Sequence, residues 1–257
     1  MKSFVDDFYL LVSLLKRREP FAFNRFSDGE LFILQNKEVL LGDNVVKIGD
    51  KVMKGHYQKD DFKHFIPAEH SFYRDRLVEA FRYKARNYFK GISCRCCAGE
   101  ADFRWQLEFH GEFDENFTWA NLLLNGNYGR FIREMYPLFN AYRTVIVCNE
   151  SADLTALPFL CKDFRVGFNA MVNDYGLIET MKKWIDENDV RGHLFLFSAA
   201  SFSKLAIHQL YEYRKDNTYI DIGTTLNVFV QLRLTRSYLK AFWLGEKHKD
   251  IDKICIW

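Results

Sequence analysis

The sequence predicts an α/β fold: a Rossmann-like, mostly parallel, doubly wound sheet with helices on both faces. In the second half of the chain, apolar or β-branched runs alternate with segments of helical periodicity, which is typical of parallel strands joined by helices. The run 193–197, HLFLF, is apolar almost throughout, as expected for a strand buried on both faces. The 257 residues include only four prolines and no Gly/Ser-rich linker, so we expect a single domain over residues 1–257.

The first half of the chain predicts few elements. Apolar residues recur at helical spacing over residues 4–15 and indicate an amphipathic first helix. The segment 21–26 predicts a strand, and the apolar residues 30–34 predict a short helix after it. Residues 70–86 have a helical pattern, whereas the rest of 40–117 has no pattern that we can assign.

The second half predicts a regular succession of strands and helices. We expect its main strands to lie in one sheet with the strand 21–26, so that their carboxyl ends share one edge. The predicted strands are 144–148, 164–168, 193–198 and 218–222, and the predicted helices are 151–160, 177–185 and 203–213.

Composition and charge exclude several classes of protein. Lys plus Arg number 36 against 34 Asp plus Glu, and a net charge of +2 gives no basic footprint for nucleic acid. No apolar stretch approaches the about 20 residues that span a bilayer, and acidic residues near the N-terminus do not suit a secretory signal. We therefore expect no transmembrane segment and a cytoplasmic location. Aromatic residues make up 17%, which fits either a bulky core or stacking platforms for a ligand.

The most informative segment is 21–30, FAFNRFSDGE. A strand there would deliver Arg25, Asp28 and Glu30 to its carboxyl end, where open α/β sheets bind ligands. Asp-x-Glu is a hard-oxygen pair suited to Mg²⁺ or Mn²⁺ that carries a phosphate ligand. The alternative is that Asp28 caps a helix and Glu30 lies in its first turn, where carboxylates are favoured.

A small-residue turn follows the strand 193–198. It contains Ser198, Ser201, Ser203 and Lys204, and its lack of bulk would let a phosphate reach the first amides of a helix. The turn has neither the Walker sequence nor a dinucleotide-binding glycine pattern. The alternative is an ordinary strand–helix turn with a serine cap.

The last predicted strand carries an acid inside an apolar run. Burial of Asp221 would cost several kcal/mol without a partner, so we expect Asp221 to be paired or to act on a ligand. Gly223 permits close approach of the backbone, and Thr224 follows it.

These motifs together resemble the GT-D class of glycosyltransferases. The segment Arg25-Phe26-Ser27-Asp28-Gly29-Glu30 is similar to the family's Arg-Phe-Gly-Asp-Gly-Glu motif, with serine in place of glycine, and Asp221-Ile222-Gly223 is similar to its Asp-Ile-Gly strand. The segment 235–238, TRSY, fits the Arg-x-Tyr of a related branch, whereas the turn 198–203 departs from the usual Gly-Pro-Thr. The resemblance covers 21–34 and, more loosely, 118–239.

The resemblance implies a single glycosyltransferase-like domain that moves a hexose or pentose from a nucleotide-diphosphate donor, with a UDP-sugar the expected donor. The acceptor would be a glycan or glycoconjugate, and Mn²⁺ or Mg²⁺ would be held by Asp28 and Glu30 as a DXE motif. Asp28, Glu30 and Asp221 would form the catalytic set, with Asp221 and Glu150 as the alternatives for general base. The donor would be bound by Arg25, Ser198, Ser201, Ser203, Lys204, Gly223, Thr224 and Arg236.

Two other functions remain open on the sequence. One is a phosphatase or nucleotidyl-type enzyme that uses the same acid pair without a sugar acceptor. The other is a nucleotide-binding interaction domain without catalysis, which the altered turn 198–203 leaves open. The sugar, the stereochemical outcome and the oligomeric state have no signal in the sequence.

The chain has six cysteines, three of them in Cys94-Arg95-Cys96-Cys97. Structural zinc sites draw cysteine pairs from two separate segments, and the second pair is missing here. We therefore expect Cys94, Cys96 and Cys97 to be reduced thiols without a metal.

Overall fold

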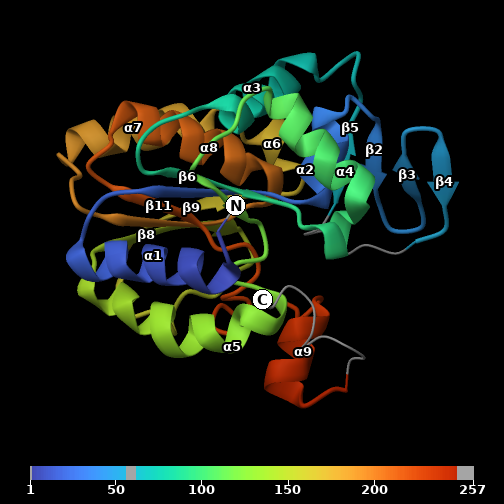
Figure 1. The fold of residues 1–257 in the computed structure, drawn as a ribbon. Coiled ribbons are helices and arrows are strands. Elements are labelled where there is room, and N and C mark those ends of the chain that lie inside the picture. The colour runs from blue at the N-terminus through green and yellow to red at the C-terminus, as the bar shows by residue number, and fades with distance from the viewer. Residues whose placement is uncertain (1, 56–61, 248–257) are drawn as a thin grey trace.

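The structure is a computed structural model that describes residues 2–55 and 62–247. Its main element is a seven-stranded sheet with the order β7-β6-β1-β11-β10-β8-β9, in which every adjacent pair of strands is parallel (Figure 1). This arrangement confirms the predicted α/β fold. The strands are β1 (Ala22–Phe26), β6 (Tyr88–Ile92), β7 (Phe117–Trp119), β8 (Thr144–Asn149), β9 (Leu160–Val166), β10 (Leu194–Ser198) and β11 (Thr218–Asp221).

The five predicted strands all lie in this sheet, while β6 and β7 were not predicted. The apolar pattern of β6 is interrupted by Lys90 and Gly91, although all five residues of the strand are buried. A Cβ on Gly91 would lie 3.0 Å from backbone atoms of Ala120 and Trp119, so the segment after β7 packs too closely for a side chain at that position.

Helices cover both faces of the sheet. Figure 1 shows α1 and α5 on one face and α3, α7 and α8 on the other. None of the helices within the described ranges is long and apolar enough to cross a membrane. The α-helices are α1 (Phe4–Arg17), α2 (Asp28–Leu34), α3 (Ser71–Arg82), α4 (Arg95–His110), α5 (Tyr128–Arg130), α6 (Ala170–Asn173), α7 (Leu177–Glu187), α8 (Ala200–Tyr213) and α9 (Ser237–Leu244), and short 3-10 and π-helical segments flank α5.

The helix predicted over 151–160 is wrong, because this segment is a series of turns that leads into β9. Side chains stabilise these turns: the carboxylate of Asp153 accepts the Thr155 backbone N–H at 2.9 Å, and Asn149 accepts that of Ser151 at 2.9 Å. Such local bonds compete with helix formation, which explains why the apolar spacing misled the prediction.

A second, antiparallel sheet is formed by residues to which the sequence assigned no pattern. Its order is β4-β3-β2-β5, and it lies beside α2 at one end of the main sheet (Figure 1). The strands are β2 (Val39–Leu41), β3 (Val46–Ile48), β4 (Lys51–Met53) and β5 (Lys63–Phe65).

Most of the aromatic residues belong to the core. Aromatic rings dominate the largest fully buried side chains, and Phe4 on α1 stacks on Trp119 at the end of β7 with centroids 5.1 Å apart. The high aromatic content is therefore chiefly a packing feature, with rings that fill the space between the sheet and its helices.

Candidate active site

A pocket with a volume of about 590 Å³ lies at the carboxyl edge of the parallel sheet. Each of the seven strands contributes a lining residue at or just after its end, as expected where an open α/β sheet binds its ligand. These residues are Ser27, Ser93, Asn121, Asn149, Gly167, Ser198 and Gly223. The pocket also brings together Asp28, Ser198 and Asp221, which the sequence analysis expected to converge there.

The two acids of the Asp-x-Glu pair have different environments. Asp28 is the first residue of α2 and is exposed, and its Oδ1 accepts the backbone N–H of Gly29 at 3.0 Å. Ser27 is the residue that precedes the helix, so Asp28 is not its N-cap. Glu30 is 3% exposed, and its Oε2 accepts hydrogen bonds from both the backbone N–H and the hydroxyl of Ser27.

Glu30 binds side chains that are distant in the sequence. Its Oε1 accepts a hydrogen bond of 2.6 Å from Ser201 Oγ and lies 3.3 Å from Lys63 Nζ, while Lys204 Nζ lies 4.0 Å from Oε2. Burial by itself would raise the pKa of Glu30, but the charges of Lys204 and Lys63 and the serine hydroxyls outweigh it and lower that pKa. Glu30 is therefore a buried carboxylate that holds two ammonium groups in place.

The donor atoms of the two acids differ in how well they fit Mg²⁺ or Mn²⁺. Glu30 already accepts four hydrogen bonds, from Ser27 twice, Ser201 and Lys63, so it does not fit a metal ligand in this arrangement. Asp28 has an exposed carboxylate, and one carboxylate together with substrate phosphates is a common way to hold Mg²⁺. The residues present thus fit a cation that is held by Asp28 alone and do not fit one that is held by Asp28 and Glu30 together.

Asp221 is the centre of a second buried ionic cluster. It is 1% exposed, and its carboxylate lies 2.5 Å from Lys204 Nζ and 3.5 Å from Arg25 Nη1. The backbone N–H of Gly223 also donates to Asp221 at 3.0 Å. The expectation that a buried acid here needs a partner is confirmed. Because two cations hold its oxygens, Asp221 is poorly placed to accept a proton from a ligand.

Gly223 makes room for this cluster. Its φ of +51° lies in the left-handed region, and a Cβ there would lie 2.3 Å from Arg25 Nη1. Arg25, which lines the pocket, also donates from Nε to the carbonyl oxygen of Ala120, and this bond fixes its guanidinium. The positive φ and the lack of space for a Cβ both require glycine at residue 223.

The residues of the serine turn between β10 and α8 divide into those that line the pocket and those that stabilise the turn. Ser198, Ser201 and Lys204 line the pocket. Ser203 does not, because its hydroxyl is fully buried and accepts the Ala199 backbone N–H at 3.1 Å. For Ser203 the alternative, a serine that stabilises the turn, describes the structure better.

The far side of the pocket comes from the segment after β11. Thr224 and Arg236 line it, as does Tyr238, whose hydroxyl lies 2.7 Å from Thr224 Oγ1. Burial raises the pKa of Tyr238, so its hydroxyl is a neutral hydrogen-bonding group. Glu150 is exposed and is not among the lining residues, so the structure does not place it as a base.

Lys63 is the important residue that the sequence analysis missed. It lies on β5 of the small sheet, and its Nζ is 2.8 Å from Ser201 Oγ as well as near Glu30. The ammonium occupies space that a side chain at residue 29 would fill, since a Cβ on Gly29 would lie 2.7 Å from Lys63 Nζ. A short Lys-His-Phe strand gives no periodicity from which this position could be predicted.

The ionisable residues around the pocket give it a positive balance. Five cationic side chains and three acidic ones line it within the described chain, which leaves two positive charges. A pocket of this sign favours an anionic ligand. The cationic residues are Arg25, Lys63, Lys204, Arg233 and Arg236, and the acidic residues are Asp28, Glu30 and Asp221.

Comparison with known proteins identifies the fold. No family model and no curated protein matches the sequence. A solved structure of domain of unknown function 1792 has a TM-score of 0.55 at 14% identity and covers 97% of this chain and 88% of that chain. A second, described as showing that this highly conserved domain has a distinct glycosyltransferase fold, gives 0.53 at 13% identity and covers 99% and 94%.

A third solved structure is described as a new glycosyltransferase of this domain type from Streptococcus sanguinis. It has a TM-score of 0.57 at 14% identity and covers 97% of this chain and 91% of that chain. Over nearly its whole length, the chain therefore has the glycosyltransferase fold of these structures, as the sequence motifs predict.

Proposed function

We propose that this protein is a glycosyltransferase that moves a sugar from a nucleotide-diphosphate donor, a UDP-sugar, to a glycan or glycoconjugate acceptor. The observation that carries the proposal is the positively charged pocket at the carboxyl edge of the sheet, in a chain with a glycosyltransferase fold. Its volume of about 590 Å³ lies in the range of small-molecule sites.

Two lysines supply positive charge for the donor diphosphate. An ammonium group has three donors. Lys204 uses two of them on Asp221 and the Ala200 carbonyl oxygen, and Lys63 uses two on Glu30 and Ser201. Each lysine has a third donor for a phosphate oxygen, and the buried carboxylates hold both groups in place before the ligand arrives.

Transfer forms a bond between the acceptor oxygen and the anomeric carbon of the sugar and breaks the bond from that carbon to the diphosphate. The leaving diphosphate gains negative charge, and Lys63, Lys204 and Arg236, which line the pocket, stabilise it in this proposal. Glu30 and Asp221 act in this proposal as positioning residues for the cations, not as bases. Ser198 and Thr224 supply hydroxyls that bind the donor's polar groups.

Asp28 acts at the reacting end of the donor. It is the one described carboxylate in the pocket that is not locked to a cation. A Mg²⁺ or Mn²⁺ ion bound with the donor would be held by Asp28 and would supply further charge stabilisation. If Asp28 holds the ion, the proton of the acceptor hydroxyl passes to the leaving diphosphate; if transfer proceeds without a metal, Asp28 accepts that proton instead. The two roles exclude each other, and a chelator separates them.

Ligand binding and turnover test the proposal together. We expect UDP to raise the melting temperature more than UMP does, and we expect a UDP-sugar to be consumed faster when an acceptor glycan is present. Donor hydrolysis that is indifferent to every acceptor would favour the phosphatase alternative. Binding of UDP without any turnover would favour the non-catalytic domain.

A further inference from the structure

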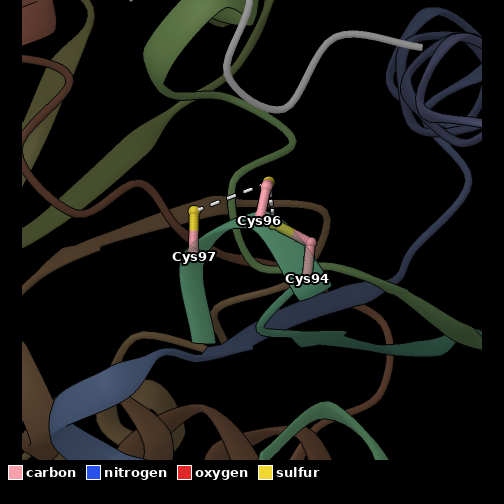
Figure 2. Close-up of side chains that lie close together, drawn as sticks. All are labelled: Cys94, Cys96 and Cys97. Atoms are coloured by element: carbon pink, nitrogen blue, oxygen red, sulfur yellow. Dashed lines mark hydrogen bonds between the residues drawn. The ribbon is translucent and has the colours of Figure 1, made fainter. Parts of the chain in front are cut away.

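Three cysteine side chains meet at the start of α4, and the proposed transfer assigns none of them a role (Figure 2). The Sγ atoms of Cys94 and Cys96 are 2.9 Å apart, and those of Cys96 and Cys97 are 3.9 Å apart. All three sulfur atoms lie within 4.8 Å of one another. The five cysteines in the described part of the chain form no disulfide bonds there, and Cys255 lies outside it.

The backbone explains why the three thiols converge. Cys94 precedes the helix with an extended backbone, at φ −78° and ψ 165°, and Cys96 and Cys97 lie in the first turn. Gly99, at φ +81°, ends this turn before the remainder of α4 begins. A side chain just before a helix folds back over the second and third helical residues, so the sulfur of Cys94 faces those of Cys96 and Cys97.

We infer that this cluster binds one thiophilic metal ion, with Zn²⁺ as the principal candidate. Two thiolates that bind one tetrahedral zinc at about 2.3 Å lie roughly 3.8 Å apart. The observed separations of 2.9 and 3.9 Å, and the limit of 4.8 Å for the set, fall on both sides of that value. Small side-chain rotations then suffice to bring three sulfurs to a common centre.

The ligand set determines which metals the cluster takes. Thiolates favour zinc and cuprous copper over Mg²⁺ and Mn²⁺, whereas a carboxylate such as Asp28 favours the hard ions. The cluster is thus chemically separate from the proposed cation position of the donor pocket. Each thiol loses its proton on binding, so the thiol contacts seen here give way to metal–sulfur bonds.

The position of the cluster suggests a zinc ion with one open coordination site. Three protein ligands plus one open position is the pattern of reactive zinc, while structural zinc is closed by four. Cys94 is buried, but Cys96 and Cys97 are exposed, and Cys97 also lines the pocket. Asn121 donates to Cys97 Sγ at 3.1 Å and would orient that ligand from outside the coordination sphere.

This inference revises the sequence-based expectation of metal-free thiols. That expectation required cysteine pairs from two segments, whereas the structure brings three ligands together from one turn of four residues. The inference is independent of the donor chemistry, because metal binding can be measured without any nucleotide or sugar.

Metal binding to the reduced, metal-free full-length protein tests the inference. We expect Zn²⁺ titrated against a chromophoric chelator to bind at one ion per chain, and Co²⁺ to give the thiolate charge-transfer absorption of a sulfur-bound ion. Cys96→Ser and Cys97→Ser should each weaken binding beyond the about 10- to 100-fold typical of outer-shell changes. Cys161→Ser is the matched control, an exposed cysteine on β9, and should bind as the wild type does.

Several results would overturn the inference. They are no Zn²⁺ or Co²⁺ binding by the reduced wild-type protein, binding unchanged in both variants, or binding lost equally in the Cys161→Ser control. Circular dichroism and melting temperatures show whether the variants are folded, and substitution at two exposed positions avoids a change at buried Cys94. A protein that binds zinc but consumes no UDP-sugar would refute the proposed function and leave this inference intact.

Discussion

Two buried lysines, Lys90 and Lys204, make similar ion pairs in different parts of the molecule. Lys90 in β6 lies 2.5 Å from a carboxylate oxygen of Asp114, and Lys204 in α8 lies 2.5 Å from one of Asp221. Their side chains are 0% and 5% exposed. By distance and burial alone, the two pairs are nearly the same.

The surroundings of the two lysines differ. The ammonium of Lys90 also contacts the Tyr83 carbonyl oxygen at 2.6 Å and His110 Nε2 at 2.7 Å, so protein groups occupy all three of its N–H donors. Burial, more than the opposing effect of Asp114, lowers the pKa of Lys90 to about 8. Lys204 lies near the start of α8, at the carboxyl edge of the sheet, and lines the pocket, whereas Lys90 does not line it. Position relative to that edge therefore separates an ion pair that lines the candidate site from one that lies away from it.

Removal of each ammonium group in turn should show the largest difference between the two ion pairs. We expect Lys204→Met to lower donor turnover by about 100- to 1,000-fold, as for loss of one preorganised charge-stabilising group. Lys90→Met should leave turnover per folded molecule unchanged, because Lys90 does not reach the pocket. Initial rates corrected for the folded fraction test this, and equal losses in the two variants would contradict the comparison.

Removal of the acids should affect stability in the opposite order, with the larger loss at Asp114 and the smaller loss at Asp221. Asp114→Ala leaves Lys90 buried and without its carboxylate, a change that typically costs about 3–5 kcal/mol of the free energy of unfolding. Asp221→Ala should cost less, because the pocket lets water reach Lys204. Urea unfolding of both variants measures the difference. A larger loss in Asp221→Ala would mean that the pocket does not hydrate Lys204.

The stability of the protein should respond to alkaline pH through Lys90. The folded protein releases the Lys90 proton near pH 8, and the unfolded chain releases it near 10.5, so the unfolded state binds more protons in this window. Lys90 therefore adds about 2 kcal/mol to the free energy of unfolding as pH rises from 7.5 to 9.5. The comparison is between wild type and Lys90→Met in urea at both pH values. A difference between them that does not change with pH would refute the lowered pKa.

An exposed lysine supplies the baseline for these variants. Lys183 on α7 is 75% exposed on its side chain and lies 3.6 Å from Glu187, and such surface pairs contribute little. Lys183→Met should change neither turnover nor the urea midpoint measurably. A loss of activity in this variant would show that the assays respond to net charge and not to the pocket.

The sequence predicts the second half of the fold well because its strands are nearly continuous apolar runs. It also predicts that Asp28, Ser198 and Asp221 converge, because the carboxyl ends of parallel strands share one edge. The strand β6 was missed since its buried lysine, Lys90, breaks the apolar pattern and depends on a partner that only the folded chain brings near.

The sequence could not predict that Asp28 and Glu30 have different environments, for a similar reason. Nothing in the spacing of Asp28 and Glu30 shows that Lys63 and Ser201 would occupy the carboxylate of Glu30. These partners come from a three-residue strand and from a turn late in the chain, and neither has a pattern that points back to residue 30. Tertiary contacts decide which acid is available to a ligand.

The strand order also determines when this protein can fold during synthesis. The strand β1 lies between β6 and β11, and Ala22 is paired with Tyr219, which the ribosome adds about 200 residues later. Until β11 leaves the ribosome, one edge of β1, a strand that is buried along its whole length in the fold, has no partner, and such edges promote aggregation. The edge of the pocket to which Asp28 and Asp221 both contribute therefore forms only after β11 has left the ribosome, and a nascent chain stalled before β11 should depend on chaperones.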